Sequence, residues 1–364
     1  MRHSGRRADL GARIRAAGLD AMLVTDLVNV RYLSGFTGSN AALLVFADDR
    51  EPVLATDGRY RTQAARQAPD LQLVIERACG RRLAGWAAAA GVHRLGFESH
   101  VVTVDGFEAL VSAAGSVEWV RAPGTVEALR EVKDPDEVAL LRSACAAADA
   151  ALADLVQRGG LRPGRTEREV GRDLETLMLD HGADGVSFET IVAAGANSAI
   201  PHHRAGDAVL AAGDFVKIDF GALLGGYHSD MTRTFVLGRA ADWQREIHEL
   251  VAAAAQAGRD ALRPGTPLAE VDAAARAVIA DAGHGGHFGH GLGHGVGLAI
   301  HEAPGISPTA AGTLRAGSVV TVEPGVYLPD HGGVRIEDTL VVPAESAGQS
   351  PESLTRFPRE LTTL

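Results

Sequence analysis

Cysteine and long apolar runs are scarce in this chain of 364 residues. The two cysteines, Cys79 and Cys145, are too few for a disulfide framework, so a reducing, cytoplasmic setting is expected. No apolar run approaches the roughly 20 residues that span a bilayer. The basic residues 1–7 lack the apolar stretch that follows in a secretory signal. We therefore expect no membrane association and no export.

Basic charge is also lacking. The formal net charge of −11 argues against a general nucleic-acid binder, which would carry a basic face. Residues 35–39 match neither the GxGxxG nor the P-loop pattern, so nucleotide binding is not expected. The composition, 46% hydrophobic and 22% charged, is that of a globular protein, and the length favours two domains.

Residues 1–124 are predicted to form an alternating α/β domain. A helix is expected at 8–18, and the Gly-, Ser- and Asn-containing segment 30–40 is expected to be a loop. The predicted strands cover 21–25, 41–46, 53–56, 71–75 and 94–98. The second domain, 125–364, should begin with a helix that Asp134 caps and that ends near Arg158.

The second domain contains an internal duplication. Leu161-Arg162-Pro163-Gly164 recurs as Leu262-Arg263-Pro264-Gly265, and each copy is followed by a threonine expected to cap a helix. Later in each copy, a Gly-led apolar strand ends in an acid, Asp219 or Glu323, 104 residues apart. Each strand then turns back toward a second acid. The pattern predicts two α+β halves whose pseudo-twofold brings four carboxylates together.

The first of these hairpins carries Asp219 and Asp230. With a two-residue turn at Leu224-Gly225, the two carboxylates would face each other directly across the ladder. Opposed Cβ atoms lie roughly 4.5–5.5 Å apart, and two like charges there are destabilising unless a cation lies between them. Two metal ions about 3.5–4 Å apart suit such a carboxylate pair.

The second hairpin carries Glu323 and Glu337, which are symmetric about the predicted turn tip, Asp330. One acidic hairpin is compatible with a solvated face. Two of them, each placing acids between apolar flanks, favour a metal site. Mn²⁺, Co²⁺, Zn²⁺ and Fe²⁺ all suit such a site, whereas a structural zinc is not expected without cysteine ligands.

Histidines cluster near these acids. The segment 289–298 is too rich in glycine for a helix and indicates close backbone approach. An imidazole from it, His290 or His294, could complete the carboxylate site, and spacing does not choose between them. His202 and His301 are rough counterparts in the two halves that could bind a substrate carbonyl and shuttle protons. The chemistry expected is hydrolysis of an amide, ester or phosphoester.

These motifs resemble the pita-bread metallopeptidase family, which includes methionine aminopeptidase, aminopeptidase P, prolidase and creatinase. The matching segments are 217–221 (KIDFG), 229–235 (SDMTRTF), 290–302, 322–327 (VEPGVY) and 334–338 (VRIED). The N-terminal domain and Tyr32 to Asn40 resemble the aminopeptidase P and prolidase branch, so almost the whole chain is covered. The resemblance implies an α+β protein in which a creatinase-like N-terminal α/β domain precedes a pita-bread domain.

The resemblance also implies roles for single residues. Two divalent metal ions, in the first place Mn²⁺, would be held by five ligands: Asp219, Asp230, His294, Glu323 and Glu337. Of these, Asp230 and Glu337 would bridge the two ions. His202 and His301 match catalytic and substrate-orienting histidines. His290 and Tyr327 match residues near the substrate, and Arg335 would support Glu337.

The implied reaction is hydrolysis of the Xaa-Pro bond at the free N-terminus of a proline-containing peptide. The segment 36–40 slightly favours an Xaa-Pro aminopeptidase, and an Xaa-Pro dipeptidase is the alternative. A metal-free binding module on the same fold and a creatinase-like amidinohydrolase are further readings, which the intact ligand set disfavours. A homodimer is expected from the family alone.

Overall fold

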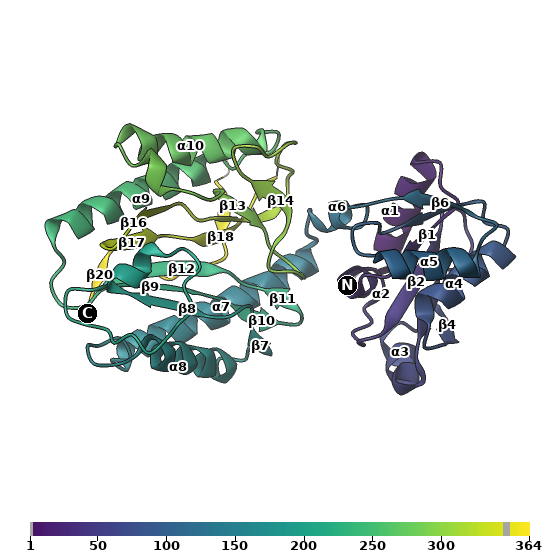
Figure 1. The fold of residues 1–364 in the computed structure, drawn as a ribbon, viewed down its shortest axis with the longest axis horizontal. Helices are drawn as coiled ribbons and strands as arrows, with labels where there is room; N and C mark the ends of the chain where they lie inside the picture. Colours follow the sequence, from purple (N-terminus) through teal and green to yellow (C-terminus); the bar gives the residue numbers. More distant parts are fainter. Residues whose placement is uncertain (1–2, 345–349) are drawn as a thin grey trace. The chain divides into compact units, whose positions relative to one another are not determined.

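In the computed structural model, which describes residues 3–344 and 350–364, the chain forms two compact units (Figure 1). The first ends at Arg130 and the second begins at Glu131. Within the described ranges, no helix is long and apolar enough to cross a membrane.

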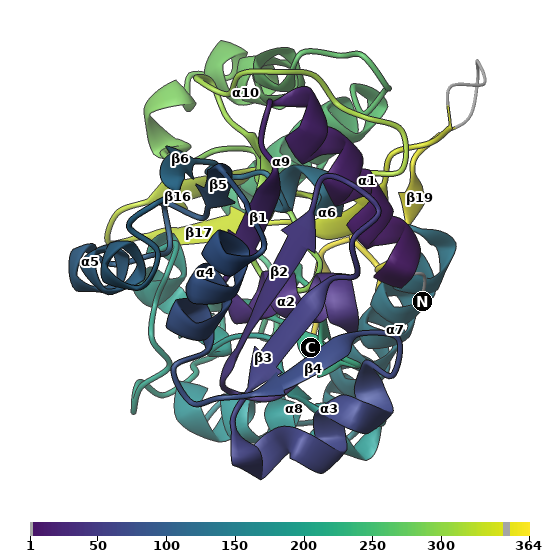
Figure 2. The ribbon, with the colours of Figure 1, turned by 90° about the vertical axis from the view of Figure 1, so that its right-hand side faces the viewer.

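The first unit is a mixed six-stranded sheet with helices packed on it, as the alternating pattern predicted (Figure 2). The strand order is β4-β3-β2-β1-β5-β6. Its strands are β1 (Ala21–Val24), β2 (Ala41–Phe46), β3 (Val53–Thr56), β4 (Gln72–Ile75), β5 (Arg94–Phe97) and β6 (Glu118–Arg121). Its helices are α1 (His3–Ala16), α2 (Leu27–Ser34), η1 (Gly58–Tyr60), α3 (Arg61–Gln67), α4 (Cys79–Ala89), α5 (Val104–Ala113) and α6 (Glu127–Arg130).

Helix α2 replaces the first part of the loop expected at 30–40, so that prediction is wrong there. The Asp26 side chain caps the helix by accepting from the backbone N–H of Asn29, and Gly35 ends it with a φ of 78°. Asp and Gly at these two positions are ordinary helix boundaries. Part of the polar segment that predicted a loop lies after Gly35, beyond the end of the helix.

The second unit consists of two similar halves. The first half has helices α7 (Pro135–Gln157) and α8 (Glu167–Asp180), with η2 (Gly195–Ala199). Its strands are β7 (Gly185–Val186), β8 (Ile191–Ala194), β9 (Phe215–Phe220), β10 (Ala222–Leu224), β11 (Tyr227–His228) and β12 (Met231–Val236). They form the sheets β11-β10-β7 and β20-β12-β9-β8.

The second half has helices α9 (Asp242–Asp260) and α10 (Leu268–Asp281), with η3 (Gly285–His287). Its strands are β13 (Gly293–Gly295), β14 (Glu302–Ile306), β15 (Val319–Val322), β16 (Gly325–Leu328), β17 (Gly332–Arg335), β18 (Asp338–Val341), β19 (Glu352–Ser353) and β20 (Thr362–Thr363). They form the sheet β14-β13-β15-β18-β19 and the pair β16-β17, while β20 joins the first half.

The helix starts follow the duplication closely. Asp134 and Thr166 cap α7 and α8 with capping boxes, as predicted. In the second copy, however, the residue at the N-cap of α10 is Pro267, so the expected cap by Thr266 is wrong. Proline there supplies no side-chain acceptor, but its fixed φ suits the entry to a helix.

Strand β9 is buried on both faces, and this places Asp219 between the halves. Val216, Ile218 and Phe220 point into the core that α7 and α8 cover. Because side chains alternate along a strand, Lys217 and Asp219 project from the other face. Phe215, on that face, belongs to the core of the second half.

The register of the first hairpin differs from the prediction. Asp219 pairs with Thr232 rather than with Asp230. The turn is Gly225-Gly226, with φ values of 58° and 82°, one residue later than expected. A two-residue turn with positive φ at both central positions suits glycine, and Leu224 would be strained in it.

The second hairpin has the predicted register. Gly325 pairs with Arg335 and Leu328 with Gly332, which is symmetric about Asp330. Asp330 has a φ of 60°, as a residue at the turn tip can.

Candidate metal centre

Four carboxylates from the two halves converge on one cavity of about 290 Å³. Asp219 lies on β9, and Asp230 directly precedes β12. Glu323 follows β15, and Glu337 lies between β17 and β18. All four line the cavity together with His294 of β13. The structure thus brings together all five residues that the resemblance implies as ligands.

His294 has its ring orientation set by the backbone. Its Nδ1 lies 3.0 Å from the carbonyl oxygen of Gly295 and can only donate to it. That bond leaves Nε2 as the atom with a lone pair. Nε2 lies 3.5 Å from Oδ2 of Asp230 and 3.4 Å from Oε1 of Glu323. Burial lowers the pKa of His294 to about 4, so the ring is neutral and can act as a ligand.

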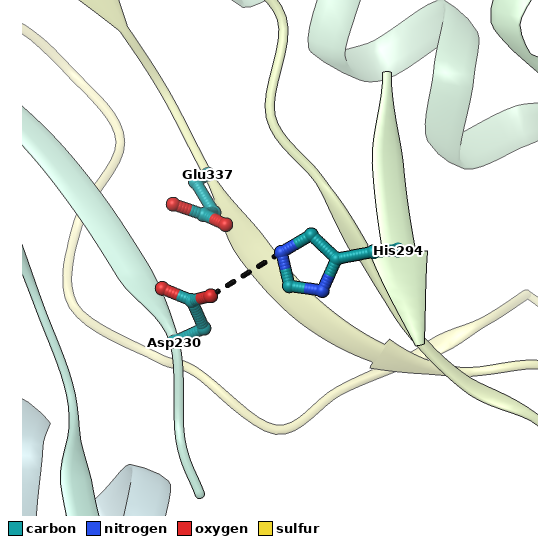
Figure 3. A group of neighbouring side chains, drawn as sticks. All are labelled: Asp230, His294 and Glu337. Carbon is teal, nitrogen blue, oxygen red and sulfur yellow. Dashed lines mark ion pairs between the residues drawn. The ribbon is translucent and has the colours of Figure 1, made fainter. Parts of the chain in front are cut away.

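The smallest cluster consists of Asp230, His294 and Glu337, which Figure 3 shows pointing toward one another. One ligand atom from each lies within 4.8 Å of the others. This spacing allows one cation to contact all three. The Oε2 of Glu337 accepts a hydrogen bond of 2.7 Å from the Thr232 hydroxyl, which holds the carboxylate in place.

The carboxylates oppose one another's ionisation. Burial, and then the charge of Glu337, raises the pKa of Asp230 well above its usual value. Burial, and then the charge of Glu323, does the same to the pKa of Glu337. Burial raises the pKa of Glu323 to about 8. A divalent cation would relieve this repulsion and keep all of them ionised.

The two carboxylate oxygens of Asp219 have different surroundings. The residue is 7% exposed, and within residues 3–344 and 350–364 its buried Oδ1 has no hydrogen-bond partner. The other oxygen, Oδ2, accepts from the guanidinium of Arg335. Buried carboxylate oxygens are normally satisfied. The residues present therefore fit a cationic group that would bind Oδ1.

Two histidines lie at the wall of the same cavity. His202 and His301 both line it and both are exposed. The ring of His301 is 4.4 Å from that of His294, edge to face. Burial, and then the charge of His202, lowers the pKa of His301. Both imidazoles are thus placed where a bound molecule could reach them.

His290, Tyr327 and Arg335 lie behind the carboxylates rather than in the cavity wall. His290 Nε2 lies 2.9 Å from the Tyr327 hydroxyl oxygen, and that oxygen accepts a hydrogen bond from Arg335 Nη1 at 2.9 Å. Burial lowers the pKa of His290 to about 4. Arg335 contacts Asp219 directly and reaches Glu337 through the hydroxyl of Thr232.

Sequence reasoning missed the other residues that line the cavity. The residues concerned are Phe188, Glu189, Ile191, His203, Arg204 and Ile300. Ile191 lies on β8, which pairs with β9 opposite Asp219. That strand lacks the turn signals that marked the hairpins, so its place was not evident. His203 and Ile300 could have been found as the neighbours of His202 and His301.

The two-unit fold and a group of side chains that could hold a metal ion are those of a metallopeptidase. A profile of the metallopeptidase family M24 matches residues 139–344, and one of the creatinase/prolidase N-terminal domain matches residues 6–132. The chain therefore belongs to metallopeptidase family M24, and its second unit has the pita-bread fold. It is a hydrolase, and members of this family use divalent metals.

Curated and solved relatives extend over nearly the whole chain. An Xaa-Pro dipeptidase of Pyrococcus horikoshii is 35% identical, with 94% of each chain covered. The structure of an Xaa-Pro dipeptidase from Bacillus anthracis has a TM-score of 0.94 at 37% identity, covering 100% of both chains. That of an X-Pro aminopeptidase from Thermotoga maritima has a TM-score of 0.89 at 33% identity, covering 98% and 99%.

Proposed function

We propose that this protein hydrolyses the Xaa-Pro bond of short proline-containing peptides. The observation that carries the proposal is the donor set of the cavity: four carboxylates and one neutral imidazole, with a buried oxygen on Asp219 to which no residue in the described part of the chain donates. The same cavity presents two exposed histidines at its wall. The relatives include an Xaa-Pro dipeptidase and an X-Pro aminopeptidase, and both names support hydrolysis of an Xaa-Pro bond.

The proposed metal ligands are Asp219, Asp230, His294, Glu323 and Glu337. Divalent ions held there, Mn²⁺ in our proposal, would supply an activated water and polarise the scissile carbonyl. His202 and His301 would orient that carbonyl and move protons to the leaving nitrogen. Phe188, Ile191 and Ile300 offer apolar surface on which the proline ring could pack.

Dipeptides are favoured as substrates over longer peptides by two observations. The cavity volume of about 290 Å³ is just below the usual range for ligand sites, roughly 300–1,000 Å³. Its wall also carries one arginine, Arg204, whose side chain is 84% exposed. A dipeptide presents a carboxylate close to the scissile bond, whereas a longer peptide carries an amide there.

Hydrolysis of Gly-Pro and Gly-Pro-Ala by Mn²⁺-loaded protein, with product analysis, tests the proposal. Cleavage of Gly-Pro alone identifies a dipeptidase, and release of Gly with Pro-Ala identifies an aminopeptidase. Failure to cleave either peptide while two metals are bound would contradict the Xaa-Pro assignment. Failure to bind metal at all would favour a binding module on this fold.

Two further proposals follow from the family and the composition. We propose a homodimer, which sedimentation analysis would test. We also propose a cytoplasmic location, which is consistent with Cys79 and Cys145 being unpaired and buried.

A further inference from the structure

The chain contains only two lysines, Lys133 and Lys217, among its 35 lysine and arginine residues. Both side chains are fully buried. Lysine is among the residues that are least often buried, because an ammonium loses several kcal/mol of hydration on leaving water. The scarcity of lysine elsewhere makes these two positions stand out.

Lys217 binds the backbone just before His202. Its Nζ donates to the carbonyl oxygen of Ile200 at 2.7 Å and lies 3.3 Å from that of Pro201. It also lies 5.0 Å from the centre of the Tyr327 ring. Within residues 3–344 and 350–364, it forms no ion pair. The backbone carbonyls are therefore its principal partners.

Other buried polar groups hold the same segment. Arg335 Nη1 donates to the carbonyl of Pro201 at 3.2 Å. On the other side of His202, the ring of His203 lies 2.7 Å from the buried carboxylate of Glu167. That carboxylate also accepts from the backbone N–H of residue 206 at 3.0 Å. The backbone is thus anchored before and after His202.

The His202 side chain itself has no such support. It is exposed, and the described part of the chain offers it no hydrogen bond. Its position in the cavity wall therefore depends on the backbone of its own segment. An imidazole that transfers protons must be held within a fraction of an ångström of the reacting atoms.

Lys217 also lies two residues before Asp219 on β9, so the two side chains share one face of the strand. One strand therefore carries both a carboxylate of the cavity and the group that holds the backbone of the His202 segment. We propose that Lys217 is a positioning residue, which sets His202 at its working distance from the metal ligands. This inference rests on the proposed function for the role of His202.

Lys133 has a parallel arrangement at the other histidine. Its Nζ lies 2.6 Å from Oε1 of Glu302, the residue that follows His301. Gly297 leaves room for this pair, because a Cβ there would lie 2.2 Å from Glu302 Oε1. The two lysines thus contact the two different segments that carry exposed histidines of the cavity. This arrangement supplies a matched comparison variant.

The test is Lys217→Met, which keeps the length of the side chain and removes its donors. We expect kcat on Gly-Pro to fall by about 10²-fold, with KM and bound metal unchanged, because a displacement of 1 Å can cost that much. In a His202→Ala background the same substitution should change kcat little, since the effect acts through His202. An equal loss in both backgrounds, or loss of metal, would overturn the proposal.

Hydrogen exchange supplies a readout that does not depend on activity. In Lys217→Met, amides in residues 200–206 should exchange about tenfold faster, while those in residues 297–302 stay unchanged. The paired variant Lys133→Met with Glu302→Gln should show the reverse. Faster exchange of both segments in either variant would indicate general loosening and would refute the proposal. If the wild type cleaves no Xaa-Pro bond, only the proposed function fails, because the exchange experiment still tests Lys217.

Discussion

The Nε2 atom of His294 lies 3.5 Å from Oδ2 of Asp230. This separation exceeds that of an ordinary hydrogen bond, about 2.7–3.2 Å. Two ligands that each bind one ion at about 2.0–2.2 Å lie roughly 3–3.5 Å apart, so the gap suits a shared cation. Removing one member of the Asp230–His294 pair should therefore test the proposed metal centre most directly.

Asp230→Asn should abolish hydrolysis and lower metal content. The loss should exceed the roughly 10–100-fold that changes to outer-shell partners of metal ligands cost. Melting of the metal-free protein should be unchanged or raised, because Asp230 no longer opposes the charge of Glu337. Kinetics, metal analysis and calorimetry on the same sample check this. Full activity in the variant would remove the proposed centre.

His301→Ala should separate catalysis from metal binding. We expect kcat to fall by about 10²–10⁴-fold, the usual contribution of general acid–base catalysis. Bound metal should stay at the wild-type level, because the group of side chains that could hold a metal ion contains His294, whereas His301 lies at the cavity wall outside that group. Loss of metal in proportion to activity would make His301 a ligand and count against His294.

The stability of the metal-free protein should depend on pH through Glu323. Its pKa of about 8 in the folded state is above the value of about 4.3 for an unfolded glutamate. The folded state thus binds this proton more tightly, and the resulting stability is present below pH about 4.3 and lost as the pH rises through about 8.

Glu323→Gln isolates that contribution because glutamine stays neutral. Relative to wild type, the metal-free variant should gain free energy of unfolding as pH rises, by at most roughly 1.4 kcal/mol per pH unit. Urea titrations of EDTA-treated protein between about pH 5 and 9 measure the difference. A difference that does not vary with pH would contradict the assignment.

Arg204→Gln should weaken binding of dipeptides. The exposed guanidinium lies 3.4 Å from Glu189 and would instead contact the carboxylate of a bound dipeptide. Exposed pairs contribute about 0.2–1 kcal/mol, so KM for Gly-Pro should rise by at most about fivefold. KM for the C-terminal amide of Gly-Pro should not change. Glu189→Gln, which removes the competing carboxylate, serves as the opposite control and should lower KM for Gly-Pro.

The sequence predicted which acids line the cavity better than it predicted which residues pair across each hairpin. Symmetry about Asp330 was confirmed because the second hairpin has a three-residue loop centred on Asp330, which adopts positive φ. The first hairpin contains two adjacent glycines after Leu224, and the choice between two turns depends on backbone dihedrals. The turn lies one residue later than predicted, so Asp219 pairs with Thr232 instead of Asp230. Asp219 and Asp230 nevertheless line the same cavity.

Contacts between segments that are distant along the chain could not be predicted from sequence patterns. Lys217 lies in a strand with apolar neighbours, and nothing local shows that it binds the carbonyls of residues 200 and 201. In the same way, Arg335 was expected to support Glu337, which it reaches through Thr232, but its direct contact with Asp219 across 116 residues was not predicted. Such pairs depend on how the two halves pack, which periodicity and turn signals do not encode.

The burial of both lysines has a consequence for the outer surface. Every cationic side chain there is an arginine or a histidine, so the folded chain offers no side-chain amine to solvent. Acetyl transfer, ubiquitin conjugation and amine-reactive dyes therefore lack a lysine target on the native protein. Since guanidinium groups do not deprotonate in proteins, the arginine charges stay fixed against both enzymatic acylation and alkaline pH.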